Sequence, residues 1–126
     1  MDASSALADL TEVSSQIETA TLLDAAGAVL GSTLADAERA ERVAAAARRL
    51  LEEAGPAERA PTQLQAATPA GSVFVVREGG RLAVATTGPE PTVGLVFYDL
   101  KSCLRNVEEP KPKPKRPRKK KTDAEA

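Results

Sequence analysis

Two periods of apolar and polar positions divide the chain, and each change of period marks the boundary of an expected element. Near the start, apolar residues recur at spacings of three and four, which predicts a first helix that Ser4 or Ser5 can cap. These helical positions are Leu7, Leu10, Val13 and Ile17. The pattern then changes to short apolar runs over residues 19–24 and 28–33, which predicts two strands.

The segment between these two strands has the composition of a tight turn. The stretch TLLDAAGAVLGST, residues 21–33, places Asp24 before two alanines and Gly27. Asp favours turns, and Gly27 is free to take a positive φ, so we expect a β-hairpin here. The hairpin carries no obvious chemistry of its own.

A long helix is predicted over residues 36–54, where Ala, Glu, Arg and Leu dominate. Glu38 and Arg42, four residues apart, suit its exposed face, and Gly55-Pro56 ends it. The opposite face carries apolar residues at helical spacing, namely Ala40, Val43, Ala44, Ala47, Leu50, Leu51 and Ala54. Because most of these are small, the face can approach either a sheet or a second helix closely.

The second half of the chain predicts three more strands. Residues 62–68 alternate polar and apolar positions, as in a strand with one solvent-exposed face. Residues 72–78 and 81–87 form the clearest strands, and Gly79-Gly80 between them fits a two-residue hairpin turn.

A final helix is predicted over residues 92–107. Residues 94–98 taken alone suit a strand, but the apolar spacing of the whole segment is helical. The element order is then α-β-β-α-β-β-β-α, and the predicted fold class is α+β, a five-stranded antiparallel sheet flanked by helices.

In the order and spacing of these elements, the chain resembles the roadblock (dynein light chain, longin-like) family, and more closely its bacterial single-domain members. The resemblance covers residues 6–107 and includes both hairpins, the Ala-rich helix and the last helix. Asp24, Gly27 and Ser32 or Thr33 match the family's pattern of an Asp, a following Gly and a small polar residue. The third strand is rich in Ala and departs from the family as the weakest element.

The resemblance implies a dimeric scaffold rather than an enzyme, with a mainly architectural first hairpin. Family members pair as homodimers or heterodimers through the long middle helix and a strand edge, which joins two sheets into one of ten strands. Bacterial members include regulators of Ras-like small GTPases, some of them GTPase-activating proteins. The helix residues expected to pair are Ala40, Val43, Ala44, Ala47, Leu50 and Leu51.

Composition gives a separate reason to expect a shared surface. The chain has 126 residues, a length typical of one domain. Its aromatic residues are two Phe and one Tyr, with no Trp. Its core must therefore consist mainly of Ala, Val and Leu, which bury little area per residue. A domain of this size is marginally stable alone, which favours pairing with a second copy or a partner.

Candidate catalytic and metal-binding residues are few. The chain has no His and a single Cys, Cys103, so an intrachain disulfide, the usual metal-site spacings and a Ser-His-Asp or Cys-His arrangement are all excluded. We expect Cys103 at the edge of the core in the last helix. No P-loop motif occurs, and we expect neither enzymatic activity nor a cofactor.

An arginine finger for a GTPase could in principle come from the long helix. The candidates are Arg39, Arg42, Arg48 and Arg49. An exposed helix face that makes weak ion pairs is the favoured interpretation of these residues.

The charge distribution separates an acidic body from a basic tail. Residues 1–109 hold 9 Lys and Arg against 16 Asp and Glu, a net charge of −7, whereas residues 110–126 hold 8 basic and 2 acidic residues, a net charge of +6. We expect a roadblock-like domain over 1–109 and a disordered Pro/Lys/Arg-rich tail over 110–126, with an extended polyproline II tendency. The basic residues of the tail are Lys111, Lys113, Lys115, Arg116, Arg118, Lys119, Lys120 and Lys121.

Two uses of this tail have equal weight. It can attract DNA, RNA or an anionic membrane without base specificity, because it has no aromatic residue to stack on bases, and such binding would depend strongly on salt. Alternatively, it can lie on the acidic body as a solubilising or masking segment.

The expected function is that of a non-enzymatic dimer that binds a Ras-like small GTPase and modulates its activity or placement, with the tail localising the complex. The alternative is a nucleoid-associated or polyanion-binding protein whose domain only dimerises. The opening MDASSALADL lacks the features of a signal peptide, and no apolar run approaches the ~20 residues of a membrane span, so we expect a cytoplasmic location.

Overall fold

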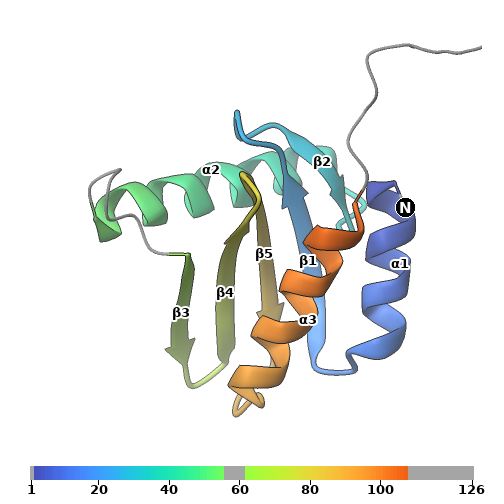
Figure 1. Cartoon of the computed structure of the whole chain (residues 1–126). Coiled ribbons are helices and arrows are strands. Elements are labelled where there is room, and N and C mark those ends of the chain that lie inside the picture. The colour runs from blue at the N-terminus through green and yellow to red at the C-terminus, as the bar shows by residue number, and fades with distance from the viewer. Residues whose placement is uncertain (1, 56–61, 108–126) are drawn as a thin grey trace, which may run out of the picture.

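The structure, a computed structural model, describes residues 2–55 and 62–107. The helices are α1 (Ala3–Val13), α2 (Ala37–Ala54) and α3 (Val93–Asn106). The strands are β1 (Ile17–Leu23), β2 (Val29–Ser32), β3 (Gln63–Thr68), β4 (Gly71–Glu78) and β5 (Arg81–Thr87). The strands form one antiparallel sheet in the order β2-β1-β5-β4-β3, with α1 and α3 on one face and α2 on the other (Figure 1). The predicted element order and fold class are confirmed.

The first helix begins earlier and ends sooner than predicted. Its cap is Asp2, whose Oδ1 accepts a hydrogen bond from the Ser5 backbone N–H at 2.8 Å, and this bond lowers the pKa of the Asp2 carboxyl. Capping by Ser4 or Ser5 was therefore wrong. The helix ends at Val13, which is 65% exposed, and Ile17 belongs to β1.

Both predicted hairpin turns form. In the first, the backbone N–H of Gly27 donates to the Asp24 carbonyl and that of Ala28 to the Asp24 carboxylate, each at 2.9 Å, and Gly27 has a φ of 91°. In the second, Gly79 and Gly80 have φ values of 61° and 82°. Two positive φ values in a two-residue loop define the type I′ turn, whose twist matches that of the strands it joins.

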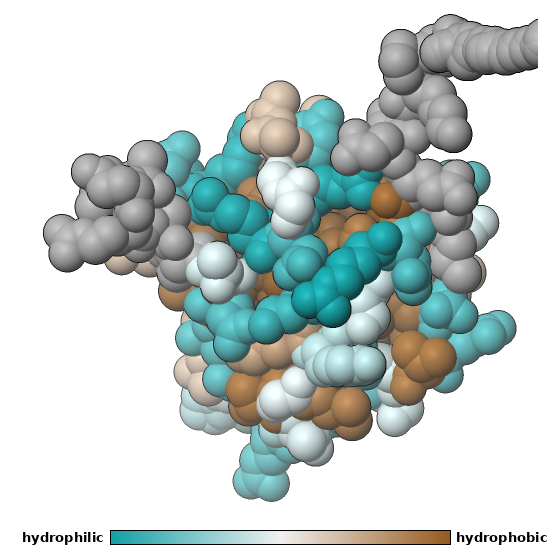
Figure 2. Space-filling view, in the orientation of Figure 1, coloured by the Kyte–Doolittle hydropathy of each residue, from teal (hydrophilic) through white to brown (hydrophobic). Residues whose placement is uncertain are grey.

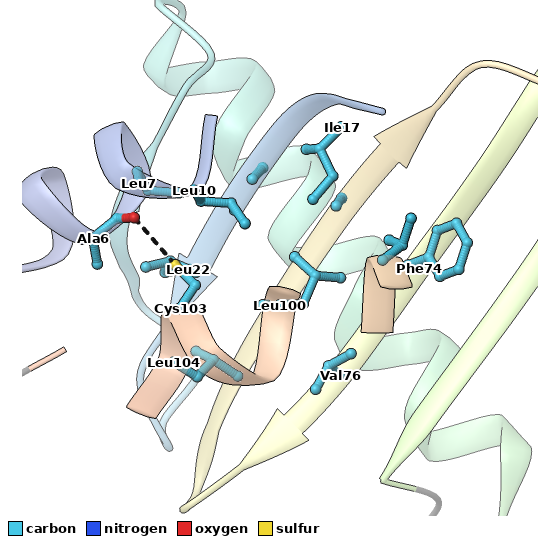
Figure 3. Close-up of a cluster of buried hydrophobic side chains, with 14 of the residues drawn as sticks. Ala6, Leu7, Leu10, Ile17, Leu22, Phe74, Val76, Leu100, Cys103 and Leu104 are labelled. Carbon is cyan, nitrogen blue, oxygen red and sulfur yellow. Dashed lines mark hydrogen bonds between the residues drawn. The ribbon is translucent and has the colours of Figure 1, made fainter. Parts of the chain in front are cut away.

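Two apolar clusters form on the two faces of the sheet. On the α1–α3 face, Phe74 is fully buried, and its ring meets that of Phe97 edge-to-face at a centroid distance of 5.0 Å. The residues around it in this cluster include Leu7, Leu10, Leu22, Val76, Leu100 and Leu104 (Figure 3). On the other face, α2 packs on the sheet through Ala44, Ala47 and Leu51. The predicted core of Ala, Val and Leu is therefore divided between two layers of helices.

The last helix is confirmed against the alternative of a strand. Thr92 occupies its N-cap position, and the Thr92 N–H donates to the Gln16 side chain at 2.6 Å. Its buried side chains, Val96, Leu100, Cys103 and Leu104, recur at helical spacing toward the sheet.

Candidate interaction surface

In the part of the chain that the structure describes, one edge of the sheet is open along its length. The order of strands places β3 at the margin, where β4 is its one partner strand among residues 2–55 and 62–107. All β3 residues except the half-buried Leu64 are exposed. The opposite edge, β2, is only four residues long and half-buried throughout. The long open edge is therefore β3.

The register shows which β3 backbone groups point outward. The Arg77 N–H donates to the Thr62 carbonyl at 2.8 Å, so these two residues form a bonded pair. Bonded and non-bonded pairs alternate along an antiparallel ladder, and every β3 residue is in continuous register with β4. The N–H and C=O groups that point away from β4 are therefore those of Gln63, Gln65 and Ala67.

Beside β3, α2 presents an apolar flank. Val43 is half-buried, Leu50 is 40% exposed and Ala54 is exposed, and their spacing places them along one side of the helix. Val43 of α2 and Leu64 of β3 both pack against the apolar cluster between α2 and the sheet. This flank of α2 therefore borders the open edge. We call the outward edge of β3 together with Val43, Leu50 and Leu64 the β3–α2 surface.

The six α2 residues assigned to pairing fall into two groups. Four of them are buried against the chain's own sheet: Ala40, Ala44, Ala47 and Leu51. They are therefore not available to a second chain, because the small side chains bring α2 onto its own sheet first. Val43 and Leu50 remain at the surface, and pairing through this helix stays a prediction that rests on them.

The α1–α3 face carries a second apolar region. The exposed side chains here are Val13, Val93, Leu95 and Tyr98. Apolar side chains gather in the lower half of this face (Figure 2). A groove of about 300 Å³ between α1 and α3 has Asp9 and Asp99 in its lining.

Cys103 was expected at the edge of the core and lies within it, as a buried member of the α1–α3 cluster. Its Sγ donates a long 3.5 Å hydrogen bond to the Ala6 carbonyl (Figure 3), and burial raises the pKa of the thiol to about 11. A thiol held neutral in this way is a poor nucleophile. Within residues 2–55 and 62–107, no cluster of three potential metal-ligating side chains occurs.

Solved structures share this architecture, although no family model and no curated protein matches the sequence. A Roadblock/LC7 domain from Streptomyces avermitilis superposes with a TM-score of 0.68 at 19% identity, over 78% of this chain and 88% of that one. A second structure of a Roadblock/LC7 domain from Streptomyces avermitilis gives 0.64 at 21% identity, over 82% and 95%. The chain has the Roadblock/LC7 fold. Myxococcus xanthus MglB is also similar, with a TM-score of 0.55 at 18% identity over 75% of this chain and 82% of MglB.

Within this roadblock fold, the sequence analysis missed two features of the surface. The first is the alternation of outward backbone groups in β3, which requires knowledge of the partner strand. The second is the position of Arg77, which the sheet brings close to α2 and which no local motif singles out. Of the helix arginines, Arg42 makes the expected i,i+4 pair with Glu38 at 4.0 Å, with both side chains largely exposed.

The basic tail, including Lys111 and Lys121, lies outside the described residues, as does the proposed boundary between residues 109 and 110. In the described part of the chain, no helix has both the length and the apolar character needed to cross a bilayer.

Proposed function

We propose that the protein is a roadblock-type dimeric adaptor that regulates a Ras-like small GTPase by binding to it. The observation that carries the dimer is the open β3 edge beside the apolar flank of α2. Antiparallel pairing of β3 with its counterpart in a second copy gives a sheet of ten strands. Each chain contributes three N–H and three C=O groups, from Gln63, Gln65 and Ala67, to the new ladder.

The side chains of β3 support this pairing. Natural proteins protect open sheet edges from association with Lys, Pro or inward-pointing charges. The strand reads QLQAAT and has none of these residues. Its alanines allow a second backbone to approach closely, while Leu50 and Val43 of the two copies gain apolar contact at the same time.

The GTPase partner is supported by the shared fold together with the family resemblance of the sequence. Regulation by surface complementarity also agrees with the buried, neutral Cys103 and with the absence of His from the chain. In this proposal the body binds the GTPase and the basic tail contributes electrostatic localisation.

A second candidate is favoured by one observation, the net charge of +6 within residues 110–126. In that case the domain only dimerises, and two tails per dimer bind DNA, RNA or an anionic membrane with increased avidity.

A pull-down from native lysate separates the two candidates. The full chain is compared with a chain that ends at Glu109, each at low and high salt, and both retained proteins and nucleic acid are identified. Retention of a small GTPase by both chains at both salt concentrations, followed by a change in its rate of GTP hydrolysis when the purified proteins are mixed, supports the GTPase proposal. Retention of nucleic acid or lipid alone, only by the full chain and only at low salt, supports the second candidate and rejects the first.

A further inference from the structure

A pocket of about 880 Å³ lies between the C-terminal half of α2 and the tips of the two hairpins. Its charged lining consists of three arginines and one glutamate: Arg48, Arg49, Arg77 and Glu52. The turn residues Ala25, Ala26 and Gly80 complete the rim. The pocket therefore carries an excess of positive charge on a body whose net charge over residues 1–109 is −7.

Within residues 2–55 and 62–107, none of the three guanidinium groups forms an ion pair with a carboxylate, although Glu52 lines the same pocket. Elsewhere in the described chain, Arg42 pairs with Glu38 and Arg105 pairs with Glu78 at 2.9 Å. Among residues 2–55 and 62–107, no side-chain hydrogen bond or ion pair involves an arginine of the pocket. The Nε of Arg77 is buried and has no acceptor within the described chain. A buried donor without an acceptor is unfavourable, and a bound anion can supply the missing acceptor.

The Arg48 side chain lies against the first hairpin turn. A Cβ atom added at Gly27 would collide with Cδ of Arg48 and lie 2.6 Å from its Nη1. The Arg48 side chain therefore extends across the turn in the space that the glycine leaves free. Gly27 serves two purposes here, because it permits the positive φ of the turn and the close approach of Arg48.

We propose that this pocket binds a small phosphate-bearing ligand. Guanidinium groups match phosphate oxygens through paired, charge-assisted hydrogen bonds, and Arg is preferred over Lys where such paired bonds matter. The volume lies within the ~300–1,000 Å³ typical of small-molecule pockets. Helical spacing places Arg48 and Glu52 on the flank of α2 opposite to Val43 and Leu50, so the pocket and the β3–α2 surface can be occupied together.

The test is a titration of the full-length protein, labelled with 15N, with inorganic pyrophosphate at constant ionic strength. The amide signals of Ala25, Ala26 and Gly80 are expected to shift saturably. Arg48→Gln and Arg77→Gln are each expected to raise the Kd by about ten-fold or more. Arg39→Gln, which removes the same charge from the exposed start of α2, is the matched control and is expected to change the Kd by less than about two-fold.

Three outcomes would overturn the proposal: no saturable shift of the pocket amides, shifts confined to the tail, or equal weakening by Arg39→Gln and Arg48→Gln. The amide spectrum shows directly whether Arg77→Gln impairs folding. If it does, Arg48→Gln still tests the proposal, because Arg48 is exposed and its replacement is not expected to disturb the fold. A parallel titration with a nucleoside diphosphate identifies the source of the phosphate. Tighter binding than pyrophosphate indicates a nucleotide, and equal binding indicates that the phosphates alone are recognised.

Discussion

Replacement of Gln65 by Pro is expected to separate the proposed dimer while leaving the monomer folded. Gln65 lies in the middle of β3, opposite Phe74 of β4, at a position whose N–H points away from β4. Proline removes this N–H without breaking a backbone hydrogen bond within the chain, and edge strands tolerate it for that reason. The substitution also removes the long 3.4 Å hydrogen bond from the Gln65 Nε2 to the Ser72 hydroxyl, which Gln65→Ala removes as well.

The magnitude follows from the two-fold symmetry of the proposed dimer. Each Gln65→Pro substitution leaves one carbonyl of the partner strand without its donor, so two buried acceptors lose their partners in every dimer. An unsatisfied buried acceptor costs about 1–3 kcal/mol, which gives a total of about 2–6 kcal/mol. At about 1.4 kcal/mol for each factor of ten, the dimer Kd is expected to rise roughly 30-fold to 20,000-fold.

Sedimentation velocity over a wide range of protein concentration measures this change, with circular dichroism as the check on folding. Gln65→Ala keeps the N–H and is expected to leave the dimer Kd nearly unchanged. Leu64→Pro removes an N–H that bonds to β4 and is expected to lower the melting temperature of the monomer. The reasoning is refuted if folded Gln65→Pro dimerises as tightly as the natural sequence, or if both Pro variants unfold alike.

Three further predictions concern the body of the domain. Phe74→Ala is expected to lower the free energy of unfolding by about 3–5 kcal/mol in denaturant titrations, because its ring is fully buried, whereas Tyr98→Ala, at a side chain 65% exposed, should change it by less than about 0.5 kcal/mol. In the same assay Gly27→Ala should cost more than Gly79→Ala, since a φ of 91° suits an L side chain less well than one of 61° and an added Cβ at Gly27 would also displace the Arg48 side chain; equal costs would contradict this expectation. Burial raises the pKa of Cys103 from 9.0 to about 11, so its contribution to stability is present below pH 9 and is lost as the pH rises to 11; rapid labelling of the native thiol by a disulfide reagent at pH 8 would show this to be wrong.

Local signals in the sequence were sufficient for the turns and for the long helix. Gly27 and Gly79 permit a positive φ because they have no Cβ, and turn-forming neighbours flank them, so both turns could be predicted without knowledge of the rest of the chain. The helical spacing that was read through to Ile17 was misleading for a physical reason. Ile17 of β1 enters the same apolar cluster as Leu10 of α1, so one continuous pattern of burial extends across two kinds of element.

Features that depend on tertiary neighbours could not be predicted in this way. Leu50 fits the apolar face of α2, yet it lies on the flank that its own sheet does not cover. Whether the N–H and C=O of Gln65 point away from the sheet depends on the register of β3 with β4. Arg77 lines the same pocket as Arg48 and Arg49 because β4 packs against α2, and no spacing along the chain contains this information.

The pairing of β1 with β5 has a consequence for how the protein is made. This pairing joins the first half of the chain, which ends with α2, to the second half, which begins with β3. The cluster around Phe74 draws side chains from both halves, so neither half can complete a core alone. During synthesis the sheet therefore cannot form completely until β5 and α3 have left the ribosome. Until then the apolar residues of the first half remain exposed to solvent. Two fragments separated between Gly55 and Thr62 are accordingly expected to remain unfolded apart and to assemble into one domain when mixed.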